Sequence, residues 1–430
     1  MKNYYKRSLF LVSAILFTVL GFAQDYSNGV FILNEGMIGN NSASVSYLNE
    51  SGTLENNIFS NQNNGMELGD TGQNIGFTED FAYVVLNYSN EVKVVNRTTF
   101  EFITTITDQM VNPRNIAFYE GNGYVTNWGD AADVNDDYIA IIDLATNSVT
   151  GKIAVAEGPE QIIQKDGFLY VAHEGGYGYG NSISVINLTT NAIEIINVSD
   201  VPSSMKIDDN NLYVLCSGKP DWTGDETIAK LYKIDLSNFQ NTEEFTFEAT
   251  EHPGYLGLDE THLYYLLNKN IYKMALTDVS LPTAAFIETA TNGAEIPYGF
   301  DKIDDKLYLS DAVDYVSPGK VFVYGEDGNF ITEYTVGSLP NGFYKWKDQT
   351  ASTEDFSKAT VSLYPNPTSD SFRLNTSENA EIAIYDLSGR NIKKLAYNNQ
   401  AISIEGLNAG VYLVQIEIEG KTTTQKLIVE

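Results

Sequence analysis

A short pattern, an aromatic residue followed by an aliphatic or aromatic one, recurs along most of the chain. Its seven copies are Phe31-Ile32, Tyr83-Val84, Tyr124-Val125, Tyr170-Val171, Tyr213-Val214, Tyr264-Tyr265 and Tyr308-Leu309. Successive copies are 52, 41, 46, 43, 51 and 44 residues apart. A repeat of this length is one supersecondary unit that cannot bury its apolar face alone, so neighbouring units must stack on one another.

Each copy is flanked by further strand patterns. A turn, often with proline, opens a strand before each copy, as at Asn112-Pro113 and Gly158-Pro159. An alternating strand closed by Asn, Asp or Thr follows, most clearly at residues 139–147 and 183–191. Alternation with a period of two between turn residues is typical of β-strands. Four strands per repeat indicate the blades of a β-propeller, and seven copies predict seven blades.

The two ends of the repeat region predict how the propeller closes. The first repeat begins at Gly29 without an opening strand, and a Pro-led segment of the missing kind, Leu339–Trp346, follows the seventh repeat. We therefore expect this C-terminal segment to pair with the N-terminal blade. Such closure removes exposed sheet edges, which otherwise invite association with other strands.

A second pattern of strands follows the repeats. Residues 348–358 are mostly polar and carry no strand pattern, so we expect a linker between a propeller over residues 24–347 and a second domain over residues 359–430. Several short alternating strands in the second domain predict a small antiparallel β-sandwich. The predicted fold class is therefore all-β, a seven-bladed β-propeller followed by this sandwich.

The N-terminus carries a targeting pattern. Three basic residues precede an apolar run over Leu9–Leu20, and small residues follow it up to Ala23. This pattern predicts a secretory signal peptide over residues 1–23, and hence a secreted protein. The alternative is a membrane anchor, but a run of twelve apolar residues is shorter than the roughly 20 needed to span a bilayer.

The charge balance excludes several classes of partner. Asp and Glu number 57 against 26 Lys and Arg, which gives a formal net charge of −31. Such a surface repels phosphate backbones and anionic lipids, so we expect no nucleic-acid partner. Cys216 is the only cysteine, which excludes an intramolecular disulfide framework and a cysteine-cluster metal site.

One face of a propeller gathers the loops between the second and third strands and the loops that lead into each blade. Aromatic side chains there can stack on a ligand while amides and carboxylates bind its polar edges. The candidate ligand-binding residues on this face are Asn34, Glu35, Asn74, Tyr88, Arg114, Asn127, Trp128, Gln161, His173, Tyr177, Trp222, Tyr255, Tyr298 and Tyr315. The same loops also hold Gln73, Glu160, Glu174 and Asn341. The alternative is that these tyrosines brace loops and these asparagines satisfy turns.

A cation site is the one cofactor hypothesis that the sequence offers. Asp133, Asn135 and Asp137 have the alternate spacing that lets oxygen ligands converge on Ca²⁺. Tyr138 occupies the position at which an EF-hand loop has glycine, and a solvated acidic turn is the alternative. No other cofactor is expected.

Catalysis has little support in the sequence, so binding without turnover is favoured. No Gly-x-Ser-x-Gly nucleophile motif stands at a strand-to-helix turn, and the chain has only three histidines. The enzymatic alternative is a Ca²⁺-dependent, lactonase-like hydrolase. Its ion would be held at the channel mouth by Glu35, Asn74, Asn127 and Glu160.

Two resemblances extend this interpretation of the propeller. Tyr124-Val-Thr-Asn127 is the signature of the YVTN-repeat seven-bladed propellers, which the chain resembles over residues 29–347. Among Bacteroidetes surface proteins, the chain is similar to the propellers that capture corrinoids (vitamin B12) beside outer-membrane transporters. This similarity implies a large, partly planar ligand and a transporter partner. Those propellers are typically lipid-anchored, whereas this chain has no cysteine at its predicted cleavage site.

The C-terminal domain resembles the sorting domain of the type IX secretion system of Bacteroidetes. The matching segments, in order, are Tyr364-Pro-Asn-Pro367, Tyr385–Arg390, Leu407–Leu413 and Lys426–Val429. The resemblance implies export to the cell surface or the medium, with the secretion machinery as a partner of residues 359–430. The predicted function is a secreted or cell-surface propeller that binds a small molecule or glycan, and the second alternative to it is an adhesion or protein-interaction module.

Overall fold

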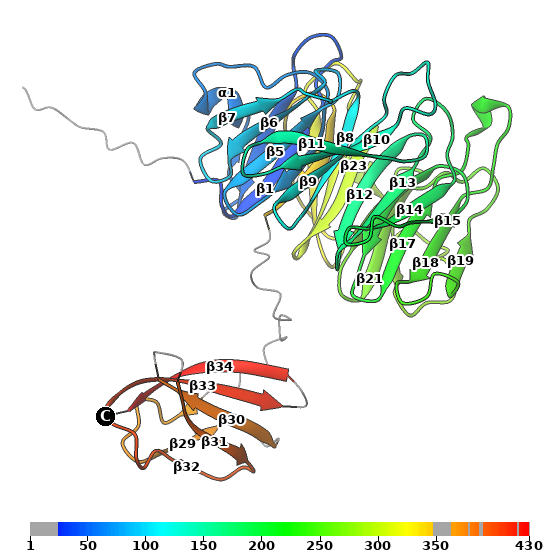
Figure 1. Cartoon of the computed structure of the whole chain (residues 1–430). Helices are drawn as coiled ribbons and strands as arrows, with labels where there is room; N and C mark the ends of the chain where they lie inside the picture. Colours follow the sequence, from blue (N-terminus) through cyan, green and yellow to red (C-terminus); the bar gives the residue numbers. More distant parts are fainter. Residues whose placement is uncertain (1–24, 347–362, 377–378, 387–389, 419–420, 430) are drawn as a thin grey trace, which may run out of the picture. The chain divides into compact units, whose positions relative to one another are not determined.

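The computed structural model describes residues 25–346, 363–376, 379–386, 390–418 and 421–429 (Figure 1). The chain divides into two compact units, Met1–Trp346 and Lys347–Glu430, and each is described by itself. The predicted signal peptide and linker lie outside the described residues. Nearly all regular structure is β-strand, which confirms the all-β prediction. No helix among the described residues is long and apolar enough to cross a membrane.

In the described part of the first unit, the strands form six four-stranded sheets and one three-stranded sheet, all antiparallel. The first sheet has the order β27 (Pro340–Tyr344), β1 (Gly29–Asn34), β2 (Ser44–Asn49) and β3 (Leu54–Glu55). The next three sheets consist of β4 (Gly72–Phe77), β5 (Phe81–Leu86), β6 (Glu91–Asn96) and β7 (Phe102–Ile106); β8 (Pro113–Tyr119), β9 (Asn122–Asn127), β10 (Tyr138–Asp143) and β11 (Ser148–Ala154); and β12 (Pro159–Lys165), β13 (Phe168–His173), β14 (Ser182–Asn187) and β15 (Ile193–Asn197).

The last three sheets continue in chain order. They consist of β16 (Pro202–Ile207), β17 (Asn211–Cys216), β18 (Lys230–Asp235) and β19 (Thr242–Thr246); β20 (Gly254–Leu258), β21 (His262–Leu267) and β22 (Asn270–Ala275); and β23 (Pro297–Ile303), β24 (Lys306–Asp311), β25 (Lys320–Gly325) and β26 (Phe330–Thr335). Three short helices lie between strands, namely α1 (Ile58–Gln62), η1 (Asp221–Thr223) and η2 (Thr289–Asn292).

The repeated aromatic pair lies in the second strand of each of these sheets. The leading residues of the seven pairs are between 0% and 6% exposed. Each first strand contacts the first strand of the next sheet, in the order β4, β8, β12, β16, β20, β23 and β27, and β27 contacts β4 again. The sheets therefore follow one another in a closed order, which gives a propeller-like arrangement (Figure 1).

Strand β27 completes the N-terminal sheet from the far end of the repeat region. It pairs antiparallel with β1, so that Ile32 lies opposite Phe343 and Leu33 opposite Gly342. The Phe343 ring is buried and packs 5.5 Å from the ring of Tyr308 in the neighbouring sheet. This pairing confirms the expectation that the C-terminal segment supplies the missing opening strand.

A β-bulge interrupts the pairing near the start of every first strand. The register shifts at Gly72/Asn74, Pro113/Ile116, Pro159/Ile162, Pro202/Ser204, Gly254/Leu256, Pro297/Gly299 and, opposite Leu33/Asn34, Pro340/Gly342.

In five of these sheets, the residue just before the first strand has a positive φ, for example 61° at the β-branched Val201. Such a conformation is costly for a branched side chain and is kept only where the surroundings enforce it. Bulges of this kind re-aim side chains, here at equivalent points of all seven sheets.

The second unit contains two antiparallel sheets around one hydrophobic core. One consists of β28 (Leu363–Tyr364), β29 (Ser371–Leu374) and β32 (Ile402–Ser403), and the other of β31 (Asn391–Tyr397), β30 (Ala380–Tyr385), β33 (Gly410–Ile418) and β34 (Lys421–Val429). Both sheets contribute to the core, for example through Phe372 on β29 and Ile382 on β30.

Candidate functional site

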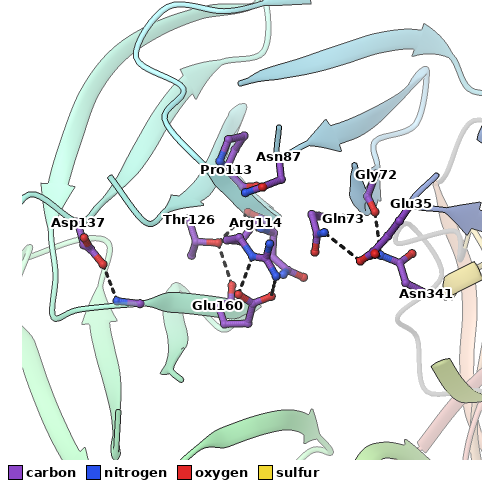
Figure 2. A network of polar contacts seen from close by, with 12 residues as sticks. Glu35, Gly72, Gln73, Asn87, Pro113, Arg114, Thr126, Asp137, Glu160 and Asn341 are labelled. Carbon is purple, nitrogen blue, oxygen red and sulfur yellow. Dashed lines mark hydrogen bonds and ion pairs between the residues drawn. The ribbon is translucent and has the colours of Figure 1, made fainter. Parts of the chain in front are cut away.

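The bulges place one side chain per sheet at the same register position. We call these seven residues the bulge ring: Gln73, Arg114, Glu160, Ser203, Tyr255, Tyr298 and Asn341. Because successive first strands contact one another in a closed order, the bulge ring brings together residues that are up to 268 positions apart, from Gln73 to Asn341. Figure 2 shows part of it as a network of polar contacts.

Arg114 and Glu160 form the central ion pair of the bulge ring. Arg114 Nε donates to Glu160 Oε2 at 2.7 Å and Nη2 donates to Oε1 at 3.1 Å, so the contact is bidentate. The guanidinium also lies 4.1 Å above the ring of Trp128. Burial opposes the charge of Arg114, but the Glu160 carboxylate outweighs it and holds the pKa of Arg114 above its usual value. Arg114 and Trp128 were both predicted as site residues.

Glu35 is held by three neutral donors from three strands. Its Oε1 accepts hydrogen bonds from Gln73 Nε2 at 3.0 Å and from Asn341 Nδ2 at 3.1 Å, and its Oε2 accepts one from the Tyr298 hydroxyl at 2.7 Å. Burial raises the pKa of Glu35 despite these bonds. Figure 2 shows the Gln73 side chain between Arg114 and Glu35. Glu35 and Tyr298 were predicted, and their direct contact was not.

Three tyrosines adjoin this network. The Tyr255 hydroxyl donates to the backbone oxygen of Tyr298 at 2.7 Å. The rings of Tyr298 and Tyr315 meet edge to face, with centroids 6.1 Å apart. Tyr255 and Tyr315 have φ values of 53° and 64°, a left-handed conformation that tyrosine seldom adopts. The structure thus brings these three predicted residues together beside Glu35.

Glu174 lies next to the ion pair without sharing in it. Its backbone nitrogen donates to Gly158 at 3.0 Å, but its carboxylate makes no hydrogen bond or ion pair with the described residues. Burial, and then the negative charge of Glu160, raise the pKa of Glu174 to about 7. In the sequence, Glu174 stands only among the further loop residues. That its carboxylate lacks a partner among the described residues could not be predicted, because this depends on Arg114 forming an ion pair with Glu160 in the folded chain.

Because the Glu174 carboxylate has no partner in the described part of the chain, we expect its effect on the free energy of unfolding to depend on pH. The folded-state pKa of Glu174 lies above its usual value of 4.5, so the stability gained from the neutral form is lost as pH rises through about 7. Glu174→Gln removes that loss. We expect the variant to be more stable than the wild type by at least about 1 kcal/mol near pH 8 and by less near pH 5. Urea unfolding at both pH values measures this, with Glu194→Gln on the exposed face of β15 as the control. Lower stability of Glu174→Gln near pH 8 would contradict it.

Three predicted site residues are instead buried at the ends of second strands. Asn34, Asn127 and His173 are at most 1% exposed. Asn34 donates to Ser44 and Ser46, Asn127 bonds the backbone at Val125 and Val111, and His173 Nε2 lies 2.7 Å from Ser184 Oγ. Burial lowers the pKa of His173 to about 4, which keeps the ring neutral. Strand packing encloses these three side chains, and their role in ligand binding stays a prediction.

Two further predicted residues link neighbouring sheets. Asn74 Oδ1 accepts from the backbone nitrogen of Ile116 at 3.3 Å, and Gln161 bonds both the nitrogen and the oxygen of Met205. Each side chain therefore ties one first strand to the next. The four residues of the lactonase hypothesis thus all make polar contacts within the protein, namely Asn74, Asn127, Glu160 and Glu35.

The remaining predicted residues lie on the rim. Tyr88, Tyr177 and Trp222 are exposed on the loops that join second to third strands, and the Trp222 side chain is 77% exposed. Tyr177 packs edge to face on Trp128, with centroids 5.6 Å apart. This contact connects the rim to the Arg114 ion pair.

The acidic loop of the cation hypothesis has internal contacts. Asp137 is buried, and its Oδ2 accepts a hydrogen bond from the backbone nitrogen of Gly158 (Figure 2). Asp133 Oδ1 accepts from the backbone nitrogen of Asn135 at 3.0 Å, which forms a turn. Burial raises the pKa of Asp137 to about 6. Among the described residues, no group of three or more His, Cys, Asp or Glu side chains is arranged to hold a metal. These contacts fit a solvated acidic turn, and the Ca²⁺ site stays a prediction.

Sequence reasoning missed Ser203 and the common register of the ring. The signal was present, because every ring residue directly follows the first residue of a first strand, which is proline in five sheets. Aligning the repeats on that position would have found all seven residues.

Comparison with known proteins places both units. A domain family described as a domain of unknown function (DUF5074) matches residues 28–309, more than half of the 430 residues. The chain belongs to this family. The family is not specifically one of YVTN repeats, so that part of the resemblance stays a prediction. A secretion system C-terminal sorting domain matches residues 362–430. The sorting domain indicates export by type IX secretion, so the protein is secreted or displayed on the cell surface.

Solved structures of similar fold support the propeller-like architecture of this family member. A quinonprotein alcohol dehydrogenase-like protein from Bacteroides thetaiotaomicron is 17% identical, covers 75% of this chain and 79% of its own, and has a TM-score of 0.54. A hypothetical selenium-binding protein from Sulfolobus tokodaii is 10% identical, covers 74% and 93%, and has a TM-score of 0.53. Identities this low show the fold alone. No match is found among curated proteins.

Proposed function

We propose that the first unit is a seven-bladed propeller of the YVTN type that binds a small ligand or glycan at the bulge ring, without turnover, outside the outer membrane. The bulge ring carries this proposal. Seven equivalent bulges aim seven side chains from separate sheets at one region, and positive φ values at Val201 and Tyr255 are held there at an energetic cost. Backbone strain concentrates at functional sites more than at purely structural ones.

The composition of the region suits ligand capture. Tyr255, Tyr298 and Tyr315 offer aromatic faces, while Arg114 and Glu160 offer fixed charges. A few placed polar groups among aromatic side chains are typical of small-molecule sites. Corrinoid capture, with an outer-membrane transporter as partner, is one form of this proposal. The second unit, proposed as a β-sandwich, would serve export through the type IX machinery.

Adhesion through the same face is the second candidate function. Exposed apolar or aromatic side chains lie on six of the loops that join second to third strands, namely Ile38, Tyr88, Val134, Tyr177, Trp222 and Tyr315. Exposed apolar side chains gathered on one face are a common mark of protein interaction sites. A macromolecular partner would contact this rim, whereas a small ligand would contact the bulge ring.

A ligand screen distinguishes these functions. The mature chain is heated with corrinoids, glycans, haem or Ca²⁺, and we expect one organic ligand to raise its melting temperature. Binding to the folded state alone stabilises it by about 2.7 kcal/mol at a hundredfold excess over Kd. Tyr255→Gly should weaken that binding by about tenfold, because glycine keeps the backbone at φ 53° but removes the ring.

The matched control is Thr250→Gly, which replaces another residue of positive φ outside the bulge ring. Its binding should equal that of the wild type. A ligand whose affinity is the same in both variants would place the site elsewhere. Stabilisation by none of the organic ligands would contradict small-ligand capture and favour adhesion.

A further inference from the structure

Around the bulge ring, carboxylates outnumber positively charged side chains. The region contains one guanidinium, that of Arg114, and three carboxylates, those of Glu35, Glu160 and Glu174. Both oxygens of Glu160 accept from Arg114, so this cation is engaged. The carboxylates of Glu35 and Glu174 form no ion pair with any described residue. Two half-buried carboxylates are thus left without an ion-pair partner among the described residues.

Neutral donors satisfy Glu35 only in part. Its hydrogen bonds come from Gln73, Asn341 and Tyr298, none of which carries a positive charge. Neutral donors supply hydrogen bonds but leave a net negative charge in a region of low solvent access. Binding of a cation stabilises such a carboxylate.

Two acceptors in the same region lack any donor. The Glu174 side chain is half-buried, and its carboxylate makes no hydrogen bond with the described residues. The Oδ1 of Asn341 is buried and also has no donor, although the Nδ2 of the same amide donates to Glu35 and Gly72. A buried acceptor without a donor costs about 1–3 kcal/mol. This cost falls on Asn341 Oδ1, which is enclosed, whereas the partly exposed Glu174 carboxylate is open to a donor from outside the chain.

Aromatic rings flank these acceptors. The Tyr255 hydroxyl donates to the backbone oxygen of Tyr298. The backbone nitrogen of Glu174 donates to the oxygen of Gly158, two residues before Glu160 of the bulge ring. Tyr298 contacts Glu35 directly, and Tyr315 packs on Tyr298. Aromatic faces attract cations through their quadrupole. Rings and unpaired carboxylates together form an environment selective for positive charge.

We propose that the ligand carries a primary ammonium group, which binds between Glu35 and Glu174. The rest of the ligand packs against Tyr255, Tyr298 and Tyr315. An ammonium group brings three N–H donors, no acceptor and one positive charge, which is what the region lacks. This inference rests on the proposed ligand site and assigns the chemical class that the site takes.

Three small probes that share one ring test the inference on the mature chain. Tyramine carries an amine, tyrosol a hydroxyl and 4-hydroxyphenylacetate a carboxylate at the equivalent position. Isothermal titration near pH 8 should detect tyramine binding, tyrosol binding at least about tenfold more weakly, and no binding of the carboxylate. Cadaverine extends the panel to an amine without a ring and should bind more weakly than tyramine.

Substitutions then assign the contact. Glu174→Gln should weaken tyramine binding by about tenfold and leave tyrosol binding unchanged. The stability expected for this variant means that a loss of binding would not reflect unfolding. Glu194→Gln, on the exposed face of β15, should leave tyramine binding unchanged.

Each outcome decides between the two proposals. Equal affinity for tyramine and tyrosol, or no effect of Glu174→Gln, would overturn the ammonium inference and leave the ligand site standing. The same holds if no amine binds at millimolar concentration while a ligand without an amine stabilises the protein through Tyr255. If nothing in either panel binds, the proposed ligand site is overturned together with the inference.

Discussion

Replacement of Arg114 by methionine should lower the free energy of unfolding of the first unit by about 3 kcal/mol. Arg114 and Glu160 are largely buried and make a bidentate contact. Removing only the cation leaves Glu160 as a buried charge next to Glu174. Breaking such a pair costs far more than the pair itself contributes, because desolvation of the remaining ion is no longer compensated.

Tryptophan fluorescence during urea unfolding measures this change. All three tryptophans, Trp128, Trp222 and Trp346, belong to the first unit, so their emission does not report on the second. The control is the double variant Arg114→Met with Glu160→Met, which removes both charges. It should recover to within about 1 kcal/mol of the wild type. A double variant as unstable as Arg114→Met would show that packing of Arg114 on Trp128, and not its charge, is what stabilises the region.

The second large effect is expected at the strand that joins the two ends of the repeat region. Phe343→Ala on β27 should destabilise the first unit by about 3 kcal/mol. The Phe343 side chain is buried against β1 and against the ring of Tyr308 in the neighbouring sheet. Its truncation leaves a cavity where the chain closes on itself, and it also loosens the pairing that protects the edge of β1.

The matched control is Phe330→Ala on β26, where the same ring is exposed. Its cost should be less than half that of Phe343→Ala, measured by the same fluorescence. Equal costs for the two variants would mean that β27 contributes no more to the stability of the unit than an outer strand does.

Much of the architecture could be predicted from the sequence because burial repeats with the strands. The aromatic pair marks the second strand of every sheet, and the displaced opening strand at Leu339–Trp346 gives the closure. These are local patterns, in which the same kind of core residue occupies the same register position of each repeat. They can be recognised in a single sequence because every repeat buries that position in the same way.

The site was harder to predict because polar residues also serve the core. The last residue of the second strand is buried in all seven sheets, and its identity varies: Asn34, Leu86, Asn127, His173, Cys216, Leu267 and Asp311. In the sheets where this last residue is leucine or cysteine, its apolar side chain indicates a buried position. In the sheets where it is asparagine or histidine, its polar side chain suggested a loop that faces solvent. Ion pairs such as that of Arg114 with Glu160 depend on which sheets are neighbours, which no local pattern contains.

The equivalent bulges of the seven first strands have a consequence for how such a protein can diversify. Each bulge contributes one side chain to the ring, whereas the aromatic pair that holds the sheet together lies on the next strand. Under the proposed function, the residues that contact the ligand and the residues that hold the sheets together therefore occupy separate positions of the same repeat. A substitution in the ring leaves the aromatic pair of the second strand in place, and ring positions outside the Arg114–Glu160 ion pair can be exchanged without leaving a buried charge unpaired. Related chains could therefore inherit one scaffold and acquire different ligands.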